Sequence, residues 1–90
     1  MYKIDYTPDS IKDVAKLKKS EPQAYKKLSK LLDELKEHPT FGTGHPKLLG
    51  ENRVNQWSRK ITEKHRLVYI IEDQTVTVLV LSVYGHYGDK

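Results

Sequence analysis

Residues 56–69 read QWSRKITEKHRLVY, and this stretch predicts a β-hairpin. Two runs with the composition of strands flank the polar tripeptide TEK, which has the length of a hairpin loop. A three-residue loop places Ile61 opposite His65 and Lys60 opposite Arg66. The hairpin therefore brings two cations face to face.

Like charges directly opposite each other on neighbouring strands destabilise a sheet, so such a pair normally needs a compensating anion. A phosphate group would supply one between Lys60 and Arg66. In the other interpretation, the two side chains turn apart into water beside Glu63 or Glu51. The sequence alone leaves both interpretations open.

Alternation along the first strand of the hairpin indicates which side chains are buried. One face carries Trp57, Arg59 and Ile61, and the other carries Gln56, Ser58 and Lys60. The aromatic and aliphatic members mark the first face as the buried one. Lys60 and its partner across the hairpin are thus predicted to lie on the outer face.

The charge of the chain is concentrated around this hairpin. Residues 47–66 hold six basic and two acidic side chains, whereas the rest of the chain holds ten of each. The whole formal net charge of +4 therefore lies in one segment. A segment of this kind is typical of a site that binds a polyanion.

The remaining sequence predicts elements in the order β-α-α-β-β-β-β. These are a strand at 2–6, a helix capped by Thr7 that begins at Pro8, a helix from Pro22 to about Glu37, and strands at 47–49, 56–61, 65–71 and 75–83. Residues 72–74 form the turn between the last two strands. This order predicts an α+β fold in which two N-terminal helices pack on one face of a mainly antiparallel sheet.

Length and composition exclude several classes of protein. A chain of 90 residues is expected to form a single domain, 1–90. The absence of cysteine excludes a disulfide scaffold, a thiolate metal site and a cysteine nucleophile. No two histidines have the spacing of metal ligands, so neither a metal nor another cofactor is predicted. No apolar run approaches the ~20 residues of a membrane span, and a soluble cytoplasmic protein is expected.

The hairpin stretch resembles the signature of the YoeB/Txe group of bacterial toxins within the RelE superfamily. The resemblance extends back through the loop PTFGTGHP, residues 39–46, and ends in the tail YGHY, residues 84–87. It covers nearly the whole chain and implies a RelE-like fold.

The resemblance also implies an activity and a set of partners. The expected activity is that of a ribosome-dependent mRNA endoribonuclease, the toxin of a type II toxin-antitoxin system. Such enzymes use no metal: the 2′-hydroxyl of the substrate attacks the adjacent phosphate, leaving a cyclic phosphate and a free 5′-hydroxyl. The expected partners are the ribosome and mRNA, a cognate YefM/Phd-like antitoxin, operator DNA through the antitoxin complex only, and a second copy in a homodimer.

This reaction needs a base for the 2′ proton, cations for the charged phosphorane and an acid for the leaving 5′ oxygen. By resemblance, Arg66 is the catalytic arginine, and Lys60 stands where the family has a second arginine. His86 and Tyr87 match the family's terminal His-Tyr pair. Arg66 would clamp the phosphate, Lys60 would act as a point charge and His86 would be the acid or base. Further residues predicted to bind RNA are Arg53, Arg59, Lys64 and His45.

The chain departs from the family at Lys47, where the usual general base is a glutamate. A protonated lysine cannot accept the 2′ proton. Either the neighbouring cations favour its neutral amine, or another group is the base, such as His86 or Glu51. A second function is therefore open: an attenuated toxin homologue that binds RNA and antitoxin and acts in transcriptional autoregulation.

Overall fold

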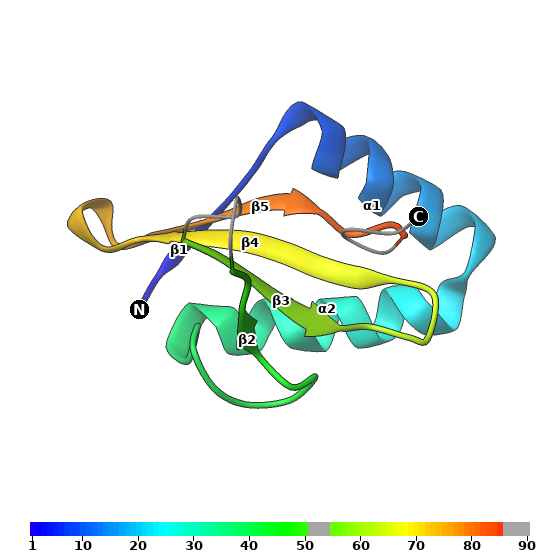
Figure 1. The fold of residues 1–90 in the computed structure, drawn as a ribbon. Helices are drawn as coiled ribbons and strands as arrows, with labels where there is room; N and C mark the ends of the chain where they lie inside the picture. Colours follow the sequence, from blue (N-terminus) through cyan, green and yellow to red (C-terminus); the bar gives the residue numbers. More distant parts are fainter. Residues whose placement is uncertain (51–54, 86–90) are drawn as a thin grey trace.

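The computed structural model describes residues 1–50 and 55–85 of the chain. These residues form strand β1 (Lys3–Tyr6), helices α1 (Pro8–Ser20) and α2 (Pro22–Glu37), strands β2 (Lys47–Leu48), β3 (Gln56–Lys60) and β4 (Arg66–Glu72), the short 3-10 helix η1 (Asp73–Thr75) and strand β5 (Thr77–Ser82). The predicted order β-α-α-β-β-β-β is confirmed (Figure 1).

The strands form one sheet in the order β1-β5-β4-β3-β2. Strand β1 pairs with β5 in parallel, whereas the other neighbouring strands pair antiparallel. The prediction of a mainly antiparallel sheet is therefore correct. Helices α1 and α2 form a helical hairpin beside this sheet (Figure 1), and neither is long and apolar enough to cross a membrane.

The predicted helix signals act as expected. The Thr7 side chain caps α1 by accepting a hydrogen bond from the backbone N–H of Ser10 (3.1 Å), and Pro8 occupies the first turn. Glu21 lies between the helices: its N–H donates to the Leu17 carbonyl (2.8 Å), and its carbonyl accepts from the Tyr25 N–H (3.0 Å). One residue thus ends α1 and begins α2, which fixes the sharp bend of the helical hairpin.

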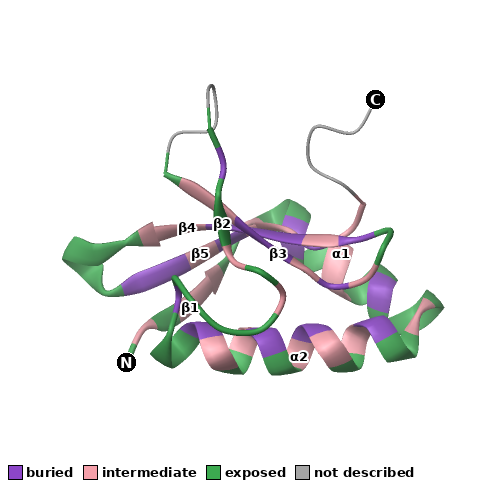
Figure 2. Cartoon of the chain, turned by 60° about the horizontal axis from the view of Figure 1, so that its bottom comes forward, coloured by how far each residue is buried: buried purple, intermediate pink, exposed green. Residues whose placement is uncertain are grey.

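The core lies between the helices and one face of the sheet. Its fully buried side chains from the helices are Leu17, Leu28, Leu31 and Leu35, and those from the hairpin and β5 include Ile61, Leu67, Tyr69, Val78 and Val80. Figure 2 shows α2 with its buried residues along one side and exposed residues along the other. The opposite face of the sheet carries the side chains of alternate parity, and Lys60 and Arg66 lie there.

Three strands begin later than predicted, and the first of them, β1, begins at Lys3 rather than residue 2. Strand β5 begins at Thr77 rather than residue 75, because Val76 adopts a left-handed conformation (φ 50°) and its N–H closes the turn on the Asp73 carbonyl (3.1 Å). Strand β4 begins at Arg66 rather than His65. The β-branched side chain of Val76 favours a strand, but the short connection between β4 and β5 requires the turn.

Candidate functional site

A small pocket opens on the sheet face opposite the helices. Its volume is about 160 Å³, and its lining residues are Gly44, His45, Lys47, Ser58, Lys60 and Arg66. Strands β2, β3 and β4 each contribute at least one of these side chains. Because three of the six lining residues are lysine or arginine, the pocket is suited to an anion.

Strand register brings the cations together. Lys47 pairs with Ser58, and Lys60 pairs with Arg66, so the four side chains share one face. The predicted pairing of Lys60 with Arg66 is confirmed. So is the predicted pairing across the hairpin loop, where the Ile61 N–H donates to the His65 carbonyl (3.0 Å).

Gly44 forms the wall of the pocket beside β3. Its carbonyl accepts a hydrogen bond from the Lys60 N–H (2.7 Å), and its φ is +87°. A Cβ atom at this position would lie 2.9 Å from the Lys60 carbonyl oxygen. Glycine is thus required for the loop to approach the strand and to place His45 at the pocket.

The two facing cations have different surroundings. Lys60 forms an ion pair with Glu63. The interpretation without a bound anion, in which this side chain lies beside Glu63, is therefore observed for Lys60. This carboxylate is 88% exposed, and an exposed pair of this kind contributes little stability. Arg66 is half-buried, and its buried Nη1 atom has no hydrogen-bond partner among the described residues. A buried guanidinium nitrogen without an acceptor is costly, and an anion in the pocket would satisfy it.

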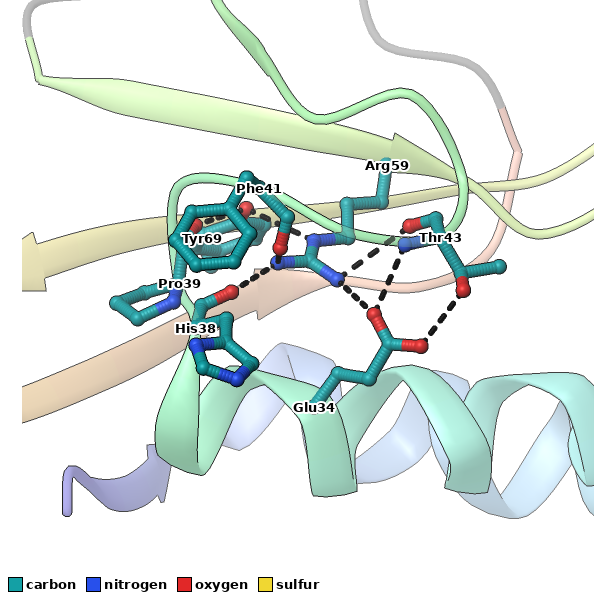
Figure 3. Close-up of polar contacts among 7 residues, drawn as sticks. All are labelled: Glu34, His38, Pro39, Phe41, Thr43, Arg59 and Tyr69. Atoms are coloured by element: carbon teal, nitrogen blue, oxygen red, sulfur yellow. Dashed lines mark hydrogen bonds and ion pairs between the residues drawn. The ribbon is translucent and has the colours of Figure 1, made fainter.

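Arg59 does not belong to this site, and its prediction as an RNA-binding residue is wrong. Its side chain is fully buried on the helix side of β3. The guanidinium donates to Glu34 (2.8 Å), to the Tyr69 hydroxyl (3.2 Å) and to three loop carbonyls (Figure 3). Those carbonyls belong to His38, Phe41 (2.9 Å) and Thr43 (3.3 Å). Arg59 is therefore a structural residue that fastens the loop after α2 to the sheet.

Glu34 completes this network from α2. The Thr43 side chain and N–H donate to its carboxylate (2.6 and 2.9 Å). These hydrogen bonds, together with that from Arg59, hold the pKa of the Glu34 carboxyl below its usual value. A carboxyl with a lowered pKa stabilises the fold above its unfolded pKa and loses that contribution as the pH falls through the folded value.

We therefore expect Glu34→Gln to be less stable than the parent protein at pH 7. The difference should shrink as the pH falls below about 4.5, the ordinary value of this carboxyl. Urea unfolding of both proteins at several pH values measures it. A difference that is constant between pH 7 and pH 3 would contradict the assigned role of the charge.

Comparison with known proteins identifies the family. A family model for the YoeB-like toxin of bacterial type II toxin-antitoxin systems matches residues 6–87. The chain belongs to this toxin family. The toxin YoeB of Escherichia coli K12 is 32% identical over 85 residues, which cover 94% of this chain and 99% of that toxin.

Solved structures of YoeB toxins share the fold. A YoeB/ParE toxin from Agrobacterium tumefaciens superposes with a TM-score of 0.89 at 28% identity, covering 94% of this chain and 99% of that one. A YoeB from Staphylococcus aureus, solved in a heterotetrameric complex with YefM, superposes with a TM-score of 0.82 at 27% identity, covering 97% and 99%. The RelE-like α+β fold predicted for this YoeB-family chain is confirmed.

The other predicted site residues of this YoeB-family toxin lie in different parts of the chain. His45 and Lys47 line the pocket. The Lys64 side chain is 75% exposed in the hairpin loop, and its Nζ atom lies 3.9 Å from Glu21 Oε2. Its contact with RNA stays a prediction. Arg53, His86 and Tyr87, and the alternative base Glu51, lie outside the described residues.

Gly85 shows where the chain leads toward the His-Tyr pair. Its carbonyl accepts a hydrogen bond from the Arg66 N–H (2.9 Å), so the residue before His86 is held at the first residue of β4. Sequence reasoning did not find this contact, nor the place of Ser58 and Gly44 in the pocket wall. The alternation that put Ser58 on the outer face of β3 was the available signal for the place of Ser58.

Among residues 1–50 and 55–85, no group of three His, Asp or Glu side chains could hold a metal ion.

Proposed function

We propose that this YoeB-family toxin is a ribosome-dependent mRNA endoribonuclease that cleaves without a metal. The observation that carries the proposal is the pocket in which Lys47, Lys60 and Arg66 converge, with the Nη1 atom of Arg66 buried and unpaired among the described residues. Cleavage of RNA by its own 2′-hydroxyl requires concentrated positive charge at one phosphate, and this pocket provides it.

In the proposed reaction, the 2′ oxygen forms a bond to phosphorus and the bond from phosphorus to the 5′ oxygen breaks. A base takes the 2′ proton, and an acid gives a proton to the leaving 5′ oxygen. Arg66 binds two oxygens of the phosphorane through its planar guanidinium, and Lys60 acts as a point charge beside it. His86 is the acid or base, and Tyr87 stacks on or hydrogen-bonds to the RNA, as the family resemblance implies.

The general base is the open part of this mechanism. Lys47 lines the pocket at the family's glutamate position, and its pairing with Ser58 directs it to the same face as Lys60 and Arg66. A third cation strengthens the binding of phosphate but cannot accept a proton in its charged form. His86 is accordingly the first candidate for the base, with neutral Lys47 and Glu51 as the alternatives.

The family indicates the partners. YoeB from Staphylococcus aureus has been solved with YefM and as a dimer. We propose that the present toxin, as a single domain in the cytoplasm, binds a YefM/Phd-like antitoxin, forms a homodimer and reaches operator DNA only through the antitoxin complex. His45 and Lys64, with Arg53, would contact the ribosome-bound mRNA.

The lysine at position 47, in place of the family's glutamate, supports a second candidate function. A toxin homologue whose pocket has three cations and, among the described residues, no lining carboxylate would bind RNA and antitoxin while cleaving poorly, and would act in transcriptional autoregulation. Induced expression separates the two functions. A nuclease arrests growth, and co-expression of the antitoxin restores it. Unchanged growth while the folded toxin accumulates would contradict the nuclease and leave the binding module.

We expect Lys47→Glu to increase single-turnover cleavage on programmed ribosomes and to weaken binding to free RNA. The change restores a proton acceptor and removes one phosphate-binding cation, so the salt dependence of RNA binding should also become less steep. Cleavage rates and salt-dependent binding curves of the two proteins measure both effects.

The matched control is Lys12→Glu, which makes the same charge change at an exposed position on α1. It should alter neither cleavage nor the binding of RNA by more than a small factor. A Lys47→Glu variant that cleaves no faster than the parent would show that another group is the base, and His86 would be tested next.

A further inference from the structure

His65 is buried beside the candidate site, and both of its ring nitrogens are engaged. The residue is only 3% exposed. Its Nε2 lies 2.8 Å from a carboxylate oxygen of Glu21, at the bend between the helices. Its Nδ1 lies 2.8 Å from the backbone nitrogen of Gly85. The ring of Tyr84 packs against it at 4.4 Å between centroids.

These contacts determine where the ring proton lies. The Gly85 N–H is a donor, so Nδ1 must present its lone pair. A neutral imidazole then carries its proton on Nε2, where the Glu21 carboxylate accepts it. The hydrogen bond with His65 lowers the pKa of the Glu21 carboxyl, which keeps this acceptor charged at neutral pH. The pair therefore selects one tautomer, and that tautomer holds Gly85.

Further contacts hold the same stretch of chain. The Asp13 carboxylate accepts from the Val83 N–H (3.2 Å), and the Lys16 ammonium lies 4.3 Å from the centre of the Tyr84 ring. The Gly85 carbonyl in turn accepts from the Arg66 N–H (2.9 Å). Residues 83–85 are thus tied to α1, to the hairpin and, at one point, to Arg66 itself.

We propose that His65 is a positioning residue: through its Nδ1 lone pair it fixes Gly85 against Arg66 and so sets where the chain leaves toward His86. The inference rests on the proposed nuclease function. His65 does not react, because it is buried and both ring nitrogens are occupied. Its loss should reduce kcat more than it raises KM, since the phosphate-binding cations stay in place.

Two amide substitutions separate the two hydrogen bonds. The Asn oxygen and the His Nδ1 are both two bonds from Cβ, so His65→Asn keeps an acceptor for Gly85 and loses the contact with Glu21. The Gln amide nitrogen and the His Nε2 are both three bonds from Cβ, so His65→Gln keeps the donor to Glu21 and loses the acceptor. Both variants shorten or reshape a buried ring, so both should lose some stability.

Single-turnover cleavage on programmed ribosomes should fall up to about 100-fold in His65→Gln, because a misplacement of about 1 Å near a reacting group can cost that much. The loss should be clearly smaller in His65→Asn, with KM similar in both. Equal losses in the two variants, or losses that follow their melting temperatures, would overturn the positioning role.

Nuclear magnetic resonance tests the anchor independently of activity. In the parent protein the ring ¹⁵N signals at neutral pH should show Nδ1 unprotonated and Nε2 protonated. The amide signal of Gly85 should move strongly in His65→Gln and less in His65→Asn. If the parent did not cleave mRNA, the proposed function would fail. The ring ¹⁵N and Gly85 amide signals would still test whether His65 holds Gly85. A proton on Nδ1, or a Gly85 signal that moves equally in both variants, would overturn it.

Discussion

Arg66→Ala is expected to reduce the rate of mRNA cleavage on programmed ribosomes by about 10²- to 10³-fold, the usual cost of removing one preorganised donor to a transition-state charge. The effect should be this large because Arg66 is the one side chain of the pocket with a buried donor atom that lacks a partner among the described residues. An anion that completes this hydrogen bond is most strongly bound when its charge is greatest, in the phosphorane.

The fold should survive the substitution. The backbone N–H of Arg66 still donates to Gly85 in the variant, and removal of the side chain relieves the repulsion from Lys60 across the hairpin. The melting temperature is thus expected to stay the same or to rise slightly. Lys12→Ala, which removes an exposed cation from α1, serves as the control and should cleave nearly as the parent does. Parental cleavage by Arg66→Ala would remove Arg66 from the mechanism.

Arg59→Met is expected to lower the free energy of unfolding by about 3–5 kcal/mol, the usual cost of removing one partner of a buried ion pair. The substitution keeps an apolar stem of similar length in the core but removes the guanidinium, which donates hydrogen bonds to Glu34, the Tyr69 hydroxyl and the loop carbonyls. The total free energy of unfolding of a domain is roughly 5–15 kcal/mol, so the variant should be close to unfolded at growth temperature.

Urea unfolding of Arg59→Met measures this loss. Lys30→Met, which removes an exposed cation from α2, controls for the change in net charge and should alter stability by less than about 0.5 kcal/mol. Arg59→Lys keeps the charge but loses the planar guanidinium with its several donors. Its free energy of unfolding should lie between those of the parent and Arg59→Met. An Arg59→Met variant that unfolds at the parental urea concentration would contradict the assigned structural role.

Local patterns were sufficient to predict the fold and the geometry of the facing cations. The alternation along residues 56–61 and the short TEK loop fix the register that places Lys60 opposite Arg66. The Thr7-Pro8 pair and the interruption at Glu21 fix the two helices. These features depend on residues within a few positions of each other, so they can be predicted from the local sequence.

Arg59 shows where sequence reasoning fails. Its alternation with Trp57 and Ile61 placed it on the buried face, but its charge suggested a role in RNA binding. Arginine is rarely fully buried unless its donors are paired, and here the acceptors come from α2 and from the loop at residues 38–43. No spacing in the sequence indicates that these distant groups converge on one guanidinium. His65 is similar, because its partners are 44 residues before it and 20 residues after it.

The burial of Arg59 also reduces the positive charge available at the outer surface. One of the six cations in residues 47–66 is buried and neutralised by Glu34, so it adds nothing to the field at the outer surface. The pocket depends instead on Lys47, Lys60 and Arg66, with Glu63 offsetting part of the charge of Lys60. In the proposed function, Lys47 accordingly carries a larger share of phosphate binding than the charge count suggests.

In the proposed mechanism, the pocket between β2, β3 and β4 cleaves mRNA on the ribosome through attack of the 2′-hydroxyl. The most direct test incubates the purified toxin with end-labelled mRNA, either free or bound in programmed ribosomes, and identifies the ends of the products. We predict cleavage of the ribosome-bound mRNA only, with a cyclic phosphate on one product and a free 5′-hydroxyl on the other. Intact mRNA on ribosomes that have bound the toxin, or products with a 5′-phosphate, would contradict the claim.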